Sequence, residues 1–146
     1  MLAHIFYSFG ILFVIRMLSS IHGFQKYHSI KEWKAIYKEK IGKPPKDSEY
    51  RNKEELDTYQ THIVLNIFEI TWLLIGLFTS NINIFISIIS MFLLMSIFSK
   101  SFRFTVFEKT MSMLFILLRF FVYLLLIVND FVYQYNLWSI LKNWIW

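Results

Sequence analysis

Four apolar runs interrupt an otherwise polar sequence, and each is long enough to cross a membrane as a helix. They occupy residues 1–18, 62–79, 82–98 and 111–128. A hydrocarbon core of about 30 Å requires roughly 20 apolar helical residues at about 1.5 Å each, and shorter spans are tolerated. The pattern therefore predicts an all-α polytopic membrane protein, with four transmembrane helices in a single domain over residues 1–146.

The connections between these runs differ greatly in length. Only Ser80 and Asn81 separate the second run from the third, which predicts a tight helical hairpin. The first and second runs are separated by the polar segment 21–61. The second membrane helix is expected to begin in the aqueous phase, because no Gly or Pro occurs between Ser48 and Ile63.

An amphipathic surface helix is predicted within the polar segment, over about 29–41. Ser29 and Glu32 have the spacing of a capping box, and Gly42 followed by two prolines ends the helix. Its apolar stripe consists of Ile30, Trp33, Tyr37 and Ile41. The helix either rests on anionic headgroups or docks a soluble partner. In both cases the expected contact residues are Trp33, Lys34, Tyr37 and Lys38.

The carboxyl-terminal segment, residues 131–146, combines aromatic residues with polar ones. Trp and Tyr favour the boundary between lipid headgroups and hydrocarbon, and the polar residues make the segment unsuited to spanning. An interfacial helix on the outer surface is therefore expected, with Trp138 and Trp144 among its membrane or partner contacts.

Basic residues are sorted by loop, and this predicts an orientation. The segment 21–61 holds nine of the fifteen Lys and Arg residues, whereas the hairpin turn holds none. Lys100, Arg103 and Lys109 lie in the connection 99–110. Because basic loops stay on the cytoplasmic or matrix side, both termini and the hairpin turn are expected outside. A bacterial plasma membrane or an inner mitochondrial membrane fits this arrangement.

Composition excludes several classes of protein. The chain is 56% hydrophobic, and it has no cysteine with which to build disulfides, thiolate metal sites or cysteine nucleophiles. The net charge of +5 does not form a basic stripe interleaved with stacking aromatics, so nucleic acid is not expected as a partner. We expect no cofactor, no metal and no catalytic residues.

Two full charges, Glu69 and Arg119, fall within the second and fourth apolar runs. An isolated charge near the bilayer centre costs about 2.5 to 3.5 kcal/mol on insertion scales, so each needs a partner. Both runs cross from inside to outside in the predicted topology. The two residues then reach similar depths, about 10 to 12 Å from the inner edge, and an ion pair between them is expected.

Polar residues flank each charge at helical spacing. His62, Asn66, Glu69 and Gly76 share one helical face, and Ser112, Arg119, Tyr123 and Asp130 share another. These faces are expected to form an intramembrane polar contact that includes Glu69, Arg119, Asn66, His62 and Tyr123. The contact either fixes the register of the helices or forms part of a proton or ion path. Arg16 is expected to extend to the headgroups.

Three functions remain open. A non-catalytic integral subunit of a larger membrane complex, respiratory or transport, is preferred because no catalytic constellation is evident. A self-assembling, holin-like pore is an alternative, although no long polar stripe is available to line a channel. A small transporter or proton-conducting subunit that uses Glu69 and Arg119 is another. The expected partners are the lipid bilayer and other membrane subunits.

Overall fold

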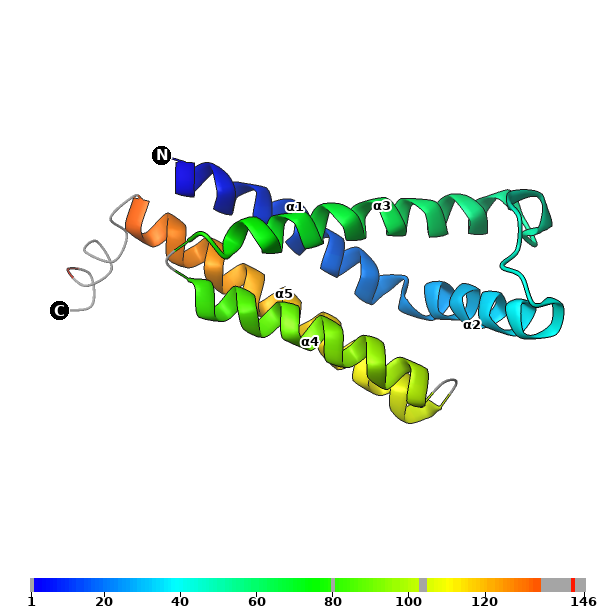
Figure 1. The fold of residues 1–146 in the computed structure, drawn as a ribbon. Coiled ribbons are helices and arrows are strands. Elements are labelled where there is room, and N and C mark those ends of the chain that lie inside the picture. Colours follow the sequence, from blue (N-terminus) through cyan, green and yellow to red (C-terminus); the bar gives the residue numbers. More distant parts are fainter. Residues whose placement is uncertain (1, 80, 103–104, 135–142, 144–146) are drawn as a thin grey trace. The chain divides into compact units, whose positions relative to one another are not determined.

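The computed structural model describes residues 2–79, 81–102, 105–134 and 143, and it is all-α (Figure 1). The described residues form five α-helices and one short 3-10 helix. In chain order these are α1 (Leu2–His22), α2 (Phe24–Ile41), η1 (Asp47–Glu49), α3 (Lys53–Gly76), α4 (Ile82–Ser101) and α5 (Val106–Gln134).

Three helices are long and apolar enough to cross a membrane. They are α1, α4 and the part of α5 from Val106 to Val132. These three helices indicate an integral membrane protein. Helix α3 contains the predicted span 62–79 only as far as Gly76. It falls outside this group because His62, Asn66 and Glu69 lower its mean hydropathy.

The chain divides into two compact units. The first combines residues 1–22 with residues from Met113 onward, and therefore contains α1 and most of α5. The second, Gly23–Ser112, contains α2, α3, α4 and the first two turns of α5. Each unit is described separately.

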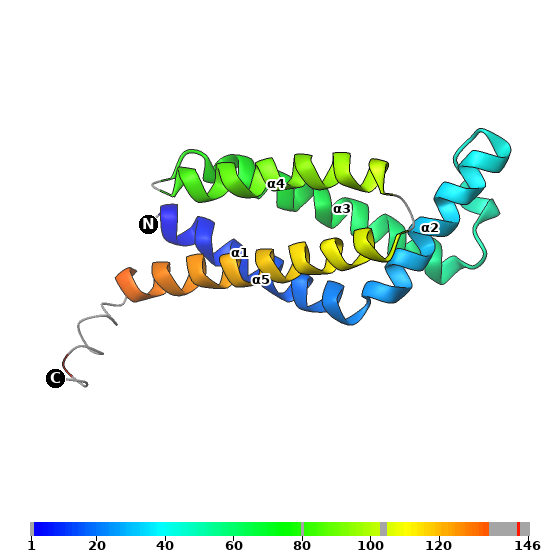
Figure 2. The same cartoon turned by 90° about the horizontal axis from the view of Figure 1, so that it is seen from below.

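Helices α3 and α4 form the predicted hairpin of the second unit (Figure 2). A glycine of α3 lies where the two helices pack closely. A Cβ atom added at Gly76 would lie 2.5 Å from the ring of Phe85, which is fully buried. The Phe85 ring also meets Trp72 edge-on, with 5.5 Å between ring centroids. The close neighbour of Gly76 is therefore an aromatic side chain.

Helix α2 and the beginning of α3 form a helical arm, residues 24–62, at one end of the second unit (Figure 1). Gly42 ends α2 in the left-handed conformation, with φ of 78°, and its N–H bonds to the Lys38 carbonyl at 2.8 Å. Asn52 caps α3 by accepting a hydrogen bond from the Glu55 N–H. The predicted stop at Gly42 and the early start of the second apolar helix are both confirmed.

Helices α1 and α4 end three or four residues after their predicted boundaries, at His22 and Ser101, and α2 and α5 depart further from the sequence expectation. Helix α2 begins at Phe24 with Gly23 as its N-cap, so Ser29 lies inside the helix and the predicted capping box at 29–32 is wrong. Helix α5 runs from Val106 to Gln134, beyond both ends of the predicted span 111–128. Apolar content marks the part of a helix that suits lipid, and it does not mark the ends of the hydrogen-bonded helix.

Candidate functional site

A buried polar cluster joins three helices of the second unit. His28 lies on α2, Ser99 near the end of α4, and Glu108 in the first turn of α5. Nε2 of His28 lies 3.1 Å from Oε2 of Glu108, and the Ser99 hydroxyl donates to Oε1 of the same carboxylate at 3.2 Å. The His28 and Glu108 side chains are 8% and 6% exposed. One carboxylate therefore binds a partner on each of its oxygens.

The start of α5 explains how Glu108 reaches this position. Thr105 precedes the helix, and its hydroxyl accepts a hydrogen bond from the Glu108 N–H at 3.1 Å. Thr105 and Glu108 thus have the spacing and half of the bonds of a capping box. The Glu108 carboxylate is directed to His28 and Ser99. Phe98, Phe102 and Phe107 pack around this end of α4 and α5, with centroid distances of 4.7 to 6.0 Å.

A second carboxylate approaches the other edge of the imidazole. Nδ1 of His28 lies 3.1 Å from Oε1 of Glu32, an ion-pair distance without the alignment of a hydrogen bond. Glu32 and Glu108 therefore lie on opposite edges of one ring, so their oxygens do not converge on a point. This agrees with the finding that no group of three metal-binding side chains occurs among the described residues.

The order of contacts differs from that of a hydrolytic triad. A serine nucleophile needs its hydroxyl on the imidazole that removes its proton. Here the Ser99 hydroxyl donates to Glu108, and His28 contacts the other oxygen of that carboxylate. The arrangement is suited to holding α2, α4 and α5 together.

The first unit contains a similar pair near the start of α1 and the end of α5. Nδ1 of His4 lies 2.8 Å from Oδ2 of Asp130, and their side chains are 23% and 12% exposed. The Phe131 ring meets His4 edge-on at 5.5 Å between centroids. Asp130 belongs to the polar face predicted for the fourth span, and its histidine partner was not predicted.

The polar face predicted on the second span is the buried face of α3. Glu69 is fully buried, and His62 and Asn66 are half-buried. By contrast, Ile67 and Phe68 are 59% and 61% exposed. The predicted polar side of the helix is therefore its buried side, and Ile67 and Phe68 lie on its exposed side.

Arg119 and Tyr123 lie on the buried face of α5, in the first unit. Tyr123 is fully buried, and the Arg119 guanidinium lies 4.7 Å above the Phe115 ring. Glu69 belongs to the second unit, so its pairing with Arg119 stays a prediction. Arg16 was expected to extend to the headgroups, and this was wrong. It lies one turn after Phe13 on the buried face of α1 and is itself buried.

Another polar contact of the second unit involves His62. Its ring stacks on Tyr27, with 3.8 Å between centroids and 27° between planes. Tyr27 also stacks on Tyr59 at 6.4 Å. His62 was predicted to join the intramembrane contact. It lies in the arm, where its ring contacts Tyr27 of α2.

Aromatic side chains hold the arm together. Trp33 packs against Tyr37 and Tyr50, with centroids 5.6 and 5.4 Å apart, and Arg51 lies over the Trp33 ring. The Tyr37 hydroxyl donates to Glu49. This bond raises the pKa of Tyr37 and lowers the pKa of the Glu49 carboxyl. The contacts that Trp33, Tyr37, Lys34 and Lys38 were expected to make with a membrane or partner stay predictions.

Sequence patterns could have identified one of the missed residues. The tetrapeptide from Thr105 to Glu108 has the capping-box pattern. Because it precedes the apolar run, hydropathy alone assigns it to the connection 99–110. His28 and His4 gave no comparable signal, because their partners lie 80 and 126 residues away. Trp138, Trp144 and most of the expected outer helix 131–146 lie outside the described residues.

Comparisons with known proteins give no further assignment. No family model matches the chain, and no match is found among curated proteins or among solved structures.

Proposed function

We propose that this chain is a non-catalytic integral subunit of a larger membrane protein complex. The main support is a face of α4 formed by Asn83, Ser87 and Ser90. These residues recur at spacings of four and three, and all three are exposed. The inner face of the helix, at Phe85 and Ile88, lies on the opposite side. Small and polar side chains on a membrane helix favour contact with another helix over contact with lipid.

The low burial of α4 within the chain also supports a partner. Only 11% of its membrane window is buried, against 33% for α1 and 28% for α5. Lipid alone suffices to cover a purely apolar helix. Lipid tails offer no hydrogen-bond partner to the hydroxyl groups of α4, which can then bond only within their own helix. The Ser87 hydroxyl does so, donating to the Asn83 carbonyl at 2.8 Å.

The proposed topology has four spans, with α3 as the additional one. This proposal is supported by the burial pattern of α3, which is the reverse of that of a helix in water: Glu69 is buried while Ile67 and Phe68 are exposed. Both termini and the turn between α3 and α4 lie outside, and the arm and the connection between α4 and α5 face the cytoplasm or matrix. The membrane is a bacterial plasma membrane or an inner mitochondrial membrane.

Cross-linking from α4 tests the proposal. The natural chain contains no cysteine, so a single introduced thiol is the only one present. Ser87→Cys or Ser90→Cys, coupled to a photoreactive maleimide in native membranes, is expected to yield one dominant adduct with another membrane protein. Leu93→Cys is the matched control, because Leu93 is 64% exposed and lies six residues from Ser87, about a third of a turn away.

Two results would count against a subunit role. One is equal, diffuse labelling from Ser87→Cys and Leu93→Cys, which indicates a helix surrounded by lipid. The other is release of an encapsulated dye when the purified protein alone is added to liposomes, which favours the pore. We expect intact liposomes and copurification of a stoichiometric partner in mild detergent.

A further inference from the structure

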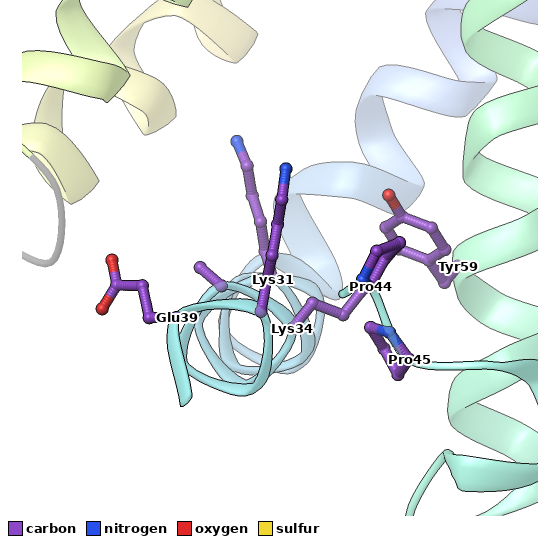
Figure 3. Close-up of a pocket in the computed structure, with 8 residues that line it drawn as sticks. Lys31, Lys34, Glu39, Pro44, Pro45 and Tyr59 are labelled. Carbon is purple, nitrogen blue, oxygen red and sulfur yellow. The ribbon is translucent and has the colours of Figure 1, made fainter. Parts of the chain in front are cut away.

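A basic cavity lies in the arm between α2, the turn that follows it and the first part of α3 (Figure 3). Its volume is about 450 Å³. The lining residues are Lys31, Lys34, Ala35, Lys38, Glu39, Pro44, Pro45 and Tyr59. Three lysines and one glutamate give this cavity a positive charge, and its size is that of a small ligand group.

The surrounding structure fixes one of the lysines in place. Nζ of Lys34 lies 3.6 Å from the centroid of the Tyr59 ring, a cation–π contact. Tyr59 is itself held between Tyr27 and Tyr50, with 6.4 Å between centroids on each side. Figure 3 shows Lys34 extending from α2 toward Tyr59. The cavity thus has a positioned cation on a preformed aromatic wall.

The other two lysines keep their charge available. Elsewhere in the arm Lys26 pairs with Glu54, and Arg51 pairs with Glu55. For Lys31 and Lys38, by contrast, no ion pair is found within the described part of the chain. In Figure 3, Glu39 projects from the side of α2 away from Tyr59. The positive charge at the Tyr59 side of the cavity is therefore left for a ligand to neutralise.

We propose that this cavity binds the phosphate of an anionic phospholipid headgroup. Lysine ammonium groups bind phosphate as point charges, and Lys31, Lys34 and Lys38 share one face of α2 at spacings of three and four. A lipid is favoured over a soluble phosphate because Ile41, seven residues after Lys34 and on the same face of α2, is 57% exposed. Helix α2 also begins two residues after the apolar helix α1 ends.

Lipid binding at this cavity does not depend on the subunit role, and it can be measured without a partner protein. The full chain, purified in mild detergent, is titrated with short-chain phosphatidylglycerol while the thermal unfolding midpoint is followed. We expect a saturable rise of the midpoint. Short-chain phosphatidylcholine and inorganic phosphate at equal concentrations should produce little change. The double variant Lys31→Gln/Lys38→Gln should weaken the apparent affinity at least about tenfold.

A matched variant separates a defined site from general attraction to negative charge. Lys40→Gln/Lys43→Gln removes the same charge from exposed positions outside the cavity, and it should change the affinity by less than about threefold. Lys31→Arg/Lys38→Arg should retain binding, which shows that loss in the Gln variant does not come from misfolding. Equal loss in both Gln variants, or equal effects of the two lipids, overturns the proposal. A saturable effect of phosphate alone overturns the lipid assignment.

Discussion

At the scale of single residues, buried polar groups connect helices that are distant in sequence. His28 and Glu108 are 80 residues apart, and His4 and Asp130 are 126 apart. Each pair places an imidazole against a carboxylate in a partly or fully buried position, where a polar group without a partner is costly. These pairs add directional contacts to helices whose outer surfaces are largely apolar.

Replacing Glu108 tests the buried cluster. Glu108→Leu removes the hydrogen-bond partner of both His28 and Ser99, and the free energy of unfolding should fall by about 1 to 3 kcal/mol. Ser99→Ala removes one bond to a charged group and should cost less. The measurement is denaturation in mixed micelles. A Glu108→Leu variant as stable as the natural chain would show that the cluster contributes nothing to stability.

Replacing Gly76 with alanine tests how closely α3 and α4 pack. Gly76→Ala places a Cβ 2.5 Å from the fully buried Phe85 ring, and overpacking of this kind costs about 1 to 3 kcal/mol. The thermal midpoint in detergent should fall. Adding Phe85→Leu should recover part of the loss, because the smaller side chain makes room. If the losses of the two single variants simply add in the double variant, the added methyl group does not clash with the Phe85 ring.

At the scale of elements, the apolar pattern predicted the helices well and their ends poorly. Helix α2 starts at Phe24, before its predicted start, because the basic segment after Gly23 has no helix breaker. Glu108 was missed because it precedes the apolar run of α5 while lying inside the helix. The capping pattern starting at Thr105 marks that helix start more accurately than hydropathy does.

The arm should have a defined pH range of stability. The hydrogen bond from Tyr37 lowers the pKa of Glu49, so its contribution is present above the ordinary glutamate value of 4.5 and is lost as the pH falls below it. The pKa of Tyr37 is raised, so the same bond is lost at alkaline pH, above the ordinary tyrosine value of 10.0. The turn 42–52 should be best ordered between these limits.

Hydrogen exchange tests this dependence. Amide exchange of the peptide covering 42–52 is measured as a function of pH and corrected for the intrinsic rate at each pH. It should be slowest between the two limits given above and should become faster as the pH falls below the lower limit. Tyr37→Phe lacks the donor, so its exchange should be faster at neutral pH and should change less on acidification. Identical pH profiles for the two proteins would contradict the role of the bond.

At the scale of the whole molecule, the distribution of polar residues favours a bilayer as the solvent. Isoleucine, leucine and phenylalanine side chains are exposed along α1, α4 and α5, whereas Glu69, Arg16 and Arg119 are buried. Three of the helices meet the requirements for a span. The proposed fourth span, α3, carries Glu69 on its buried side, a feature that mean hydropathy does not register.

The predicted pairing of Glu69 with Arg119 is tested by a mutant cycle. If the two charges neutralise each other, Glu69→Leu or Arg119→Leu alone leaves an uncompensated buried charge and should cost about 3 to 5 kcal/mol. The double variant should then accumulate in membranes better than either single variant. If the double variant accumulates no better than the worse single variant, Glu69 and Arg119 do not form an ion pair.

The four-span topology requires α3 to cross the membrane, and cysteine labelling measures whether it does. Single cysteines replace Lys43 in the arm, Asn81 in the hairpin turn, or Lys100 at the end of α4, in a chain with no other thiol. Membrane vesicles of known orientation are treated with an impermeant maleimide. Four spans predict that Lys43→Cys and Lys100→Cys label from the cytoplasmic or matrix side and Asn81→Cys from the other. Labelling of Lys43→Cys and Asn81→Cys from the same side would show that α3 does not cross.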